Sequence, residues 1–226
     1  MKPSGIKKFL SILLLLPVFF SAGNLNAQQP FEDEIKAFKK QDSISRPPTN
    51  AILLVGSSSF RKWTDVQSYF PGYTIINRGF GGSTLPDVIR YTNEVIIPYK
   101  PKQVLIYCGD NDLASSDTIT AATVAQRFKQ LFYLIRKGLP KANISFVSIK
   151  PSPSRQHLLP KMQKANALIK SFLSQHKNTS FINVFTPMLL PNNKPRPDIF
   201  LEDSLHMNEK GYAIWQKTIR PYLLKK

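Results

Sequence analysis

Residues 51–63 read AILLVGSSSFRKW, and they set the architecture that the rest of the chain follows. Five apolar residues, 51–55, run without interruption and end at Gly56, which is typical of a strand buried on both faces of a parallel sheet. Three serines follow at once, before a segment that can turn helical. A side chain directly after such a strand lies at the carboxyl edge of the sheet, where open α/β sheets bind their ligands. We therefore expect the first part of a functional site at these serines.

Apolar runs and helical patterns alternate along the remaining chain. Further strands are expected at residues 73–77, 103–108, 144–149 and 181–185. Apolar residues at helical spacing predict helices over residues 31–40, 85–99, 118–137, 160–176 and 208–224. Strands that alternate with helices indicate a parallel sheet covered on both faces. The sequence thus predicts a three-layer α/β/α fold, flavodoxin-like and doubly wound, with about five parallel strands.

Length and composition limit the class of protein. A chain of 226 residues suits one domain with a sizeable core, and 42% hydrophobic with 20% charged residues excludes a disordered chain or a multi-span membrane protein. The net charge of +17 predicts either a basic soluble surface or attraction to an anionic partner such as acidic glycan or lipid headgroups. Because no nucleic-acid motif accompanies the charge, we expect no nucleic-acid partner.

The first 27 residues have the pattern of a secretory signal peptide. Three lysines precede an apolar run at residues 9–20, which is too short for a bilayer span of roughly 20 residues. Cleavage is expected after Ala27, with a site near Gly23 as the alternative, so we expect a periplasmic or secreted protein without a stable membrane span. An uncleaved anchor is the other interpretation. Residues 28–49 then form a lead-in segment that prolines end.

Four polar segments follow predicted strands or precede the last helix, so they are expected to meet at one edge of the sheet. They are residues 56–59, 77–84, 109–112 and 203–208. The serines suit a helix cap or a nucleophile, and the glycine-rich second segment suits a tight turn or an anion-binding loop. Asn111 can cap a helix or donate to a developing oxyanion. Asp203 and His206 are spaced so that the carboxylate can hold one imidazole nitrogen while the other faces a serine.

Taken together, these segments resemble the SGNH, or GDSL-like, family of esterases and lipases, which is named for Ser, Gly, Asn and His. The matching positions are Ser58, Gly82, Asn111 and His206, and Asp203 matches the family's triad acid. The resemblance covers residues 51–224. Where the family commonly has Gly-Asp-Ser, this chain has Gly-Ser-Ser, which is similar to the platelet-activating-factor acetylhydrolase-like branch.

The resemblance implies ester hydrolysis through an acyl-enzyme. Ser58 would be the nucleophile, His206 the base that accepts its proton, and Asp203 the group that orients the imidazole. The backbone N–H groups of Ser58 and Gly82 and the side-chain amide of Asn111 would form the oxyanion hole. No cofactor and no metal are implied, and residues 50–226 would be the SGNH hydrolase domain.

We expect an exported serine esterase that acts on small O-acyl groups, chiefly acetyl, with acylated carbohydrate among its candidate substrates. The alternatives are a phospholipid or lysophospholipid acylhydrolase and a non-catalytic α/β module that binds an anion at residues 79–84. Arg155 and His157 follow the fourth strand, so they either border the site and contact substrate or belong to an ordinary surface loop.

Overall fold

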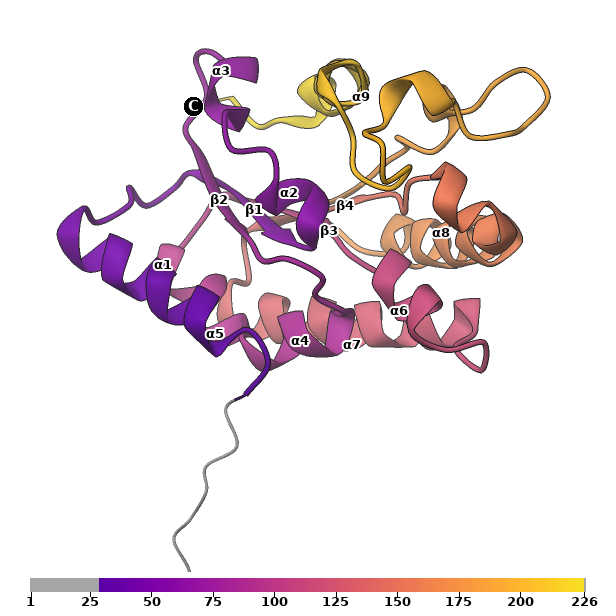
Figure 1. Ribbon diagram of the computed structural model, residues 1–226. Coiled ribbons are helices and arrows are strands. Elements are labelled where there is room, and N and C mark those ends of the chain that lie inside the picture. The colour runs from indigo at the N-terminus through magenta and orange to yellow at the C-terminus, as the bar shows by residue number, and fades with distance from the viewer. Residues whose placement is uncertain (1–28, 226) are drawn as a thin grey trace, which may run out of the picture.

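Five parallel strands form the centre of the computed structural model, which describes residues 29–225 (Figure 1). The strands are β1 (Ile52–Gly56), β2 (Ile75–Gly79), β3 (Gln103–Tyr107), β4 (Asn143–Val147) and β5 (Thr179–Ile182). Their order in the sheet is β2-β1-β3-β4-β5, and every neighbouring pair is parallel. This order is that of flavodoxin-like doubly wound sheets, so the predicted fold class is confirmed.

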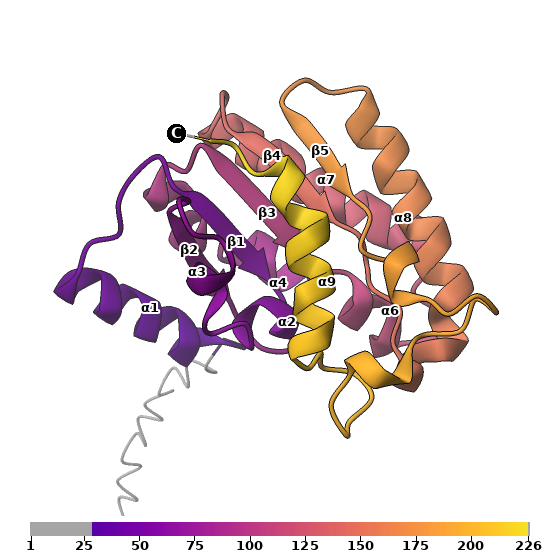
Figure 2. The same ribbon diagram turned by 90° about the horizontal axis from the view of Figure 1, so that it is seen from above.

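Helices cover both faces of the sheet (Figure 2). The α-helices are α1 (Glu32–Ile44), α2 (Ser58–Arg61), α3 (Val66–Tyr69), α4 (Leu85–Arg90), α5 (Thr92–Val95), α6 (Asp110–Ser115), α7 (Ala121–Gly138), α8 (Leu159–Ser174) and α9 (Glu209–Ile219). The short 3-10 helices are η1 (Ile97–Tyr99), η2 (Pro153–Leu158), η3 (Thr186–Met188), η4 (Pro197–Ile199) and η5 (Arg220–Tyr222). Core residues of α1, α4, α5, α7 and α8 form one layer, and those of α2, α3 and α9 form the other.

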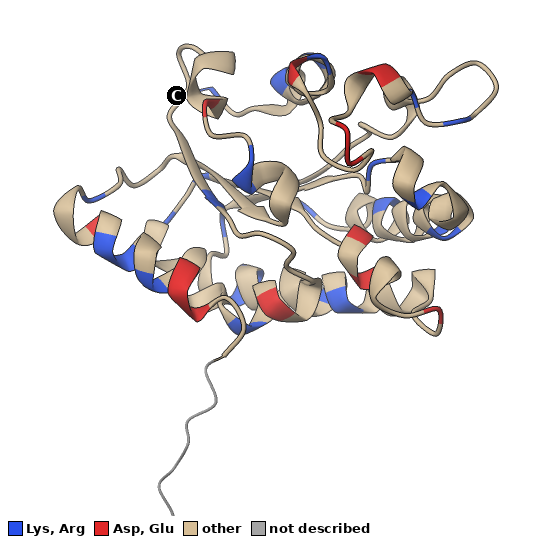
Figure 3. Cartoon of the chain, in the orientation of Figure 1, with Lys and Arg blue, Asp and Glu red and all other residues tan. Residues whose placement is uncertain are grey.

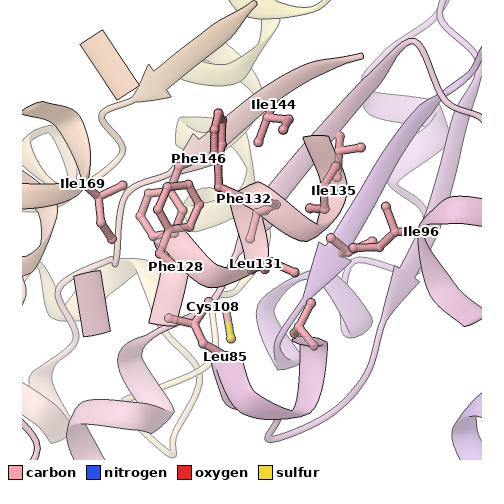
Figure 4. Close-up of a cluster of buried hydrophobic side chains, with 14 of the residues drawn as sticks. Leu85, Ile96, Cys108, Phe128, Leu131, Phe132, Ile135, Ile144, Phe146 and Ile169 are labelled. Carbon is pink, nitrogen blue, oxygen red and sulfur yellow. The ribbon is translucent and has the colours of Figure 1, made fainter. Parts of the chain in front are cut away.

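The uninterrupted apolar sequence of β1 serves both layers. Successive side chains of a strand point to opposite faces, so Leu53 and Val55 pack toward α7 and its neighbours, while Ile52 and Leu54 pack toward α9. On the first face, Phe128 of α7 meets Phe146 of β4 with 4.8 Å between ring centroids (Figure 4). A strand with one solvated face would instead alternate apolar and polar residues.

Aromatic side chains fill the layer on the opposite face. The rings of Trp63 and Tyr212 stack with centroids 4.9 Å apart, and Trp215 of α9 meets Tyr107 of β3 edge-on at the same separation. Large aromatic side chains bury much apolar area, and such ring pairs add roughly 1 kcal/mol beyond that burial. Tyr212 and Trp215, three residues apart in the helix predicted over residues 208–224, therefore form part of the inner face of α9.

The last residue of β1 is glycine, Gly56, because no side chain fits at this position. Its φ is 123°, and a Cβ atom at this position would lie 2.0 Å from the carbonyl oxygen of Tyr107 on the neighbouring strand. The glycine therefore lets the chain leave the sheet sharply and begin α2 two residues later. This turn is what places the serines of residues 57–59 at the carboxyl edge.

The prediction of a single helix over residues 85–99 is wrong, because this segment forms three shorter helices, α4, α5 and η1. Thr84 precedes α4 and forms a capping box with Asp87. The backbone leaves the helical conformation twice: Tyr91, with φ −97° and ψ 13°, separates α4 from α5, and Ile96, with φ −127° and ψ −61°, separates α5 from the 3-10 turn η1. Apolar spacing alone did not reveal these breaks.

The lead-in segment forms a longer helix than the expected 31–40 and packs against the sheet. Ile35 of α1 is buried in the core, and Asp42 near its end accepts hydrogen bonds from Arg78 and from the Tyr99 hydroxyl. Burial, with the Asp42 hydrogen bond adding to it, raises the pKa of Tyr99 to about 12. α1 is thus an integral part of one helical layer.

The signal peptide expected at residues 1–27 lies outside the described residues. Within residues 29–225, the structure has no helix that is both long and apolar enough to cross a membrane. Figure 3 shows acidic and basic residues side by side on α1, whereas α8 carries Lys and no Asp or Glu.

Candidate active site

The four polar segments meet at the carboxyl edge of the sheet, as expected for the ends of parallel strands. Ser58 begins α2 directly after β1, and Gly82 lies in the loop after β2. Asn111 is in the first turn of α6 after β3, and His206 lies in the loop before α9. Hydrogen bonds connect Ser58 with His206 and Ser57 with Asn111, although 148 and 54 positions separate these pairs in the chain.

A chain of two hydrogen bonds joins Ser58, His206 and Asp203. The Nε2 atom of His206 lies 3.0 Å from the Ser58 hydroxyl oxygen, and its Nδ1 atom lies 2.6 Å from Oδ2 of Asp203. Because an ionised carboxylate only accepts, Nδ1 carries the proton and donates to Asp203. Nε2 is then free to accept the proton of the Ser58 hydroxyl.

The loop between Phe200 and Met207 holds Asp203 beneath the imidazole. Oδ1 of Asp203 accepts the backbone N–H groups of Leu205 and His206 at 3.0 and 2.9 Å. Burial works to raise the pKa of Asp203, but the hydrogen bonds from the His206 ring and from these two N–H groups outweigh it and hold the pKa below its ordinary value. Asp203 therefore stays ionised and keeps its orientation, although its side chain is 46% exposed.

The three neighbouring serines have different surroundings. The hydroxyl of Ser58 meets His206, whereas the buried Ser57 accepts a 2.7 Å hydrogen bond from Nδ2 of Asn111. Ser59 is also buried, and its carbonyl oxygen accepts the Tyr212 hydroxyl of α9. This last bond ties α2 to the helix that follows the His206 loop, so it fixes the two halves of the site relative to each other.

Asn111 and Gly82 lie beside the serines. Besides Ser57, Nδ2 of Asn111 reaches the carbonyl oxygen of Ser83 at 3.1 Å, which joins the third segment to the second. Gly82 has a φ of 77°, a left-handed conformation that favours glycine, and it is exposed. As the first residue of α2, Ser58 has a backbone N–H with no partner inside that helix.

Sequence reasoning missed a cluster of buried charges behind Asn111. Oδ2 of Asp110 lies 3.0 Å from Nη1 of Arg155 and 3.7 Å from Nζ of Lys150, which is 1% exposed. Burial would raise the pKa of the Asp110 carboxyl, but the two cations and the Tyr107 hydrogen bond keep that pKa below its ordinary value. The signal was present in the sequence as an acid next to Asn111 and a lysine at the end of an apolar strand, but the pairing depends on the fold.

Arg155 and His157, which the sequence offered together as substrate contacts, have different surroundings in the structure. Arg155 is nearly buried and donates to Oδ1 of Asn111 at 2.8 Å, so it lies behind the site. His157 is exposed on η2. The neighbouring Ser154 donates through both its backbone N–H and its hydroxyl to the carbonyl oxygen of Ser204, which links η2 to the Asp203 loop.

Asp112 was likewise not assigned a role from the sequence. Its carboxylate accepts the backbone N–H of Leu85 at 2.9 Å and Nη1 of Arg127 at 2.7 Å. Burial raises its pKa, and these two bonds only partly offset that effect. Asp112 thereby fixes the start of α4, and with it the loop that contains Gly82, against α6. Within residues 29–225, no group of three His, Cys, Asp or Glu side chains has the arrangement of a metal site.

Comparison with protein families matches residues 42–214 to the model of the GDSL-like lipase/acylhydrolase family. The chain belongs to this family. It is therefore a carboxylic ester hydrolase, and the resemblance carried by the four segments is confirmed. A comparison with curated protein sequences gives no match.

Solved structures of GDSL-like proteins share the fold. A GDSL-like lipase from Bacteroides thetaiotaomicron superposes with a TM-score of 0.70 at 21% identity, over 83% of this chain and 96% of that one. A Streptococcus pneumonia protein, provisionally described as a platelet activating factor, gives 0.74 at 20% identity over 85% and 92%. An acetyl-xylooligosaccharide esterase from Geobacillus gives 0.61 at 14% identity over 79% and 96%. At these sequence identities, the similarity to the three solved structures shows a shared fold and no more.

Proposed function

We propose that this GDSL-like hydrolase is an exported serine esterase that removes small O-acyl groups, chiefly acetyl, through a Ser58–His206–Asp203 triad. The observation that carries the proposal is the pair of hydrogen bonds at 3.0 and 2.6 Å that joins the three side chains. A serine hydroxyl becomes a nucleophile when an adjacent base accepts its proton, and a third group must hold that base in the right tautomer. Ser58 supplies the hydroxyl, His206 the base and Asp203 the group that holds the base, which supports the proposal.

In the proposed reaction, Ser58 Oγ attacks the ester carbonyl carbon while its proton passes to Nε2 of His206. The tetrahedral intermediate collapses as the imidazolium gives this proton to the leaving alcohol, and an acyl-Ser58 ester remains. Water then attacks the acyl carbon with His206 again as base, which releases the carboxylic acid and restores Ser58. Asp203 stabilises the imidazolium throughout and stays ionised.

The negative charge of the tetrahedral intermediate would be bound by three donors. They are the backbone N–H groups of Ser58 and Gly82 and the side-chain Nδ2 of Asn111. Since Nδ2 donates its two hydrogens to Ser57 Oγ and the Ser83 carbonyl oxygen, one of these bonds would give way to the bond with the oxyanion. The exposure of Gly82 and the position of Ser58 at a helix start support these assignments. Loss of one such donor typically costs about 3 kcal/mol of transition-state stabilisation.

Two observations support a small acyl group on a polar alcohol. A cavity of about 690 Å³ borders the site through Met207, and its lining mixes charged residues with aromatic ones. Lys62, Glu209 and Lys210 in this lining suit hydroxyl groups better than an acyl chain, and Tyr69 offers a ring for a sugar. The Geobacillus esterase, which shares the fold, is described as acting on acetyl-xylooligosaccharides.

Export is proposed from the signal-peptide pattern of residues 1–27 alone. N-terminal sequencing of the mature protein from its native host tests it. The proposal expects a mature chain that begins at Gln28, and an intact Met1 would contradict it.

Hydrolysis of chromogenic esters of increasing acyl length tests the activity. Wild type is expected to prefer the acetyl ester, with kcat/KM falling steeply by the octanoyl ester, and to release acetate from acetylated xylooligosaccharide. Ser58→Ala is expected to abolish turnover, whereas the matched control Ser59→Ala retains it. Preference for long acyl chains or lysophospholipid would replace the acetylesterase with a lipid acylhydrolase, and full activity of Ser58→Ala would overturn the triad.

A further inference from the structure

The carboxamide of Asn111 is held at both ends. Its Oδ1 accepts a 2.8 Å hydrogen bond from Nη2 of Arg155, and its Nδ2 donates to Ser57 Oγ at 2.7 Å and to the Ser83 carbonyl oxygen at 3.1 Å. The two ends of a carboxamide have nearly the same shape but opposite hydrogen-bonding roles. A guanidinium group has only donors, so it selects the orientation in which Oδ1 faces Arg155 and Nδ2 faces the serines.

Arg155 is itself fixed by buried groups. Its side chain is 16% exposed, and Nη1 lies 3.0 Å from Oδ2 of Asp110. The Tyr107 hydroxyl donates to the same oxygen at 3.1 Å, and Oδ1 of Asp110 accepts the backbone N–H of Asn111 at 3.0 Å. Asp110 therefore anchors both the backbone of Asn111 and the guanidinium that orients the Asn111 side chain.

The arrangement also strengthens Asn111 as a donor. A charged donor on Oδ1 draws electron density from the amide, and linked hydrogen bonds polarise one another in a low-dielectric interior. The Nδ2–H group thus becomes a better donor toward negative charge. Since both terminal nitrogens of Arg155 face Asp110 and Asn111, neither points to where the substrate ester would lie against Ser58.

We infer that Arg155 is a positioning residue for the oxyanion hole, acting through Asn111 and not by contact with substrate. The inference rests on the proposed function, in which Nδ2 of Asn111 binds the oxyanion. It replaces the expectation that Arg155 contacts substrate. Arg155 orients and polarises the Asn111 amide, so its contribution appears in the transition state and depends on Asn111 being present.

A double-mutant cycle with Arg155→Lys and Asn111→Ala tests the inference. Lysine keeps the positive charge beside Asp110 but lacks the planar fork that serves Asp110 and Asn111 together. Arg78→Lys is the matched control, because Arg78 is also nearly buried and pairs with an acid, Asp42 of α1, without contacting Asn111. Values of kcat and KM for a short-chain ester and the thermal midpoint are measured for every variant.

We expect Arg155→Lys to lower kcat about tenfold or more with KM nearly unchanged, while Arg78→Lys keeps a kcat close to that of wild type. In the Asn111→Ala background, Arg155→Lys should change kcat by less than about twofold, because the group it positions is gone. Wild-type kcat for Arg155→Lys would overturn the inference. The inference would also be overturned if the reductions in kcat of the two single variants multiplied in the double variant. Arg155 would then act on substrate or on the fold independently of Asn111.

Ser58→Ala, assayed beside the cycle, separates this inference from the proposed function. If Ser58→Ala or Asn111→Ala keeps full activity, the proposed function itself fails. If both lose activity while the Arg155 and Asn111 effects multiply, the inference alone fails. Should Arg155→Lys lower the thermal midpoint strongly, the cycle is repeated with Arg155→Met, which leaves Asp110 paired with the buried Lys150 and so leaves no buried ion without a partner.

Discussion

Ser58 differs from its two serine neighbours only in what the fold brings to it. The motif position selected Ser58 from the sequence, and its hydroxyl is the one that lies 3.0 Å from His206. The departure from Gly-Asp-Ser also acquires a physical meaning, since the Ser57 hydroxyl accepts from Asn111 where the family commonly has a carboxylate. A neutral acceptor there leaves the Asn111 amide without an adjacent anion.

The residues behind the site were not predictable in the same way. Asp110, Lys150 and Arg155 are separated by up to 45 positions, and each alone reads as a loop or surface residue. Their pairing depends on side-chain direction at the ends of β3 and β4, which no local pattern encodes. Asp203 and His206 were predictable because three residues of spacing already place them within reach.

Replacement of Asp110 tests the buried cluster. Asp110→Asn leaves two buried cations without their anion, so the free energy of unfolding at neutral pH should fall by about 3 kcal/mol. The Asp110 pKa is lower in the folded chain than the value of about 3.9 in the unfolded chain. Its stabilisation is therefore present above that pH and is lost as the pH falls through the folded value.

Urea unfolding from neutral pH down to about pH 3 measures this dependence. The difference in unfolding free energy between wild type and Asp110→Asn should shrink as the solution becomes acidic. A difference that stays constant over this range would contradict the ionised pairing of Asp110 with Lys150 and Arg155.

Among the elements, the strands were predicted best. Short runs rich in apolar residues identify the strands, and the five expected runs each overlap a strand of the sheet. Helix ends were predicted less well, because capping, proline and tertiary contacts decide them. The broken segment at residues 85–99 and the extension of α1 to Ile44 show both effects.

α1 offers a test of whether the lead-in segment belongs to the fold. Asp42 accepts from Arg78, whose side chain is 8% exposed, and from Tyr99. Asp42→Ala should lower the free energy of unfolding by about 3 kcal/mol, because a nearly buried guanidinium loses its anion. Asp33→Ala, an exposed acid on the same helix, is the matched control and should change it by less than about 0.5 kcal/mol. Equal effects of the two variants would show that α1 is dispensable.

For the whole molecule, charge is distributed very unevenly. Residues 118–197 contain thirteen Lys and Arg and no Asp or Glu, whereas the other described residues hold fourteen of each sign. This basic segment folds into α7, β4, η2, α8 and β5, so the excess charge lies at one side of the sheet order. The net charge of the chain does not show this asymmetry, which results from the absence of acidic residues in residues 118–197.

The asymmetry predicts salt-dependent capture of anionic esters. The field of α8, whose first turn follows η2 beside the site, should raise the local concentration of a negatively charged acetyl ester at low ionic strength. The kcat/KM for this negatively charged ester should fall about twofold to fivefold as the salt concentration rises to about 0.5 M, while the kcat/KM for a neutral ester stays constant. Neutralising the α8 lysines Lys161, Lys164 and Lys170 to Gln should weaken this dependence more than neutralising Lys36, Lys39 and Lys40 of α1. Equal weakening by both sets would contradict it.

The proposed triad is tested most directly by covalent labelling with a fluorophosphonate probe, followed by mass-spectrometric mapping of the modified peptide. A serine that His206 activates attacks the phosphorus and keeps the adduct. The proposed triad predicts one label, on Ser58, that is absent in Ser58→Ala and in His206→Ala and present in Ser59→Ala. A label on Ser57 or Ser59, or ester hydrolysis by a protein that takes up no label, would contradict it.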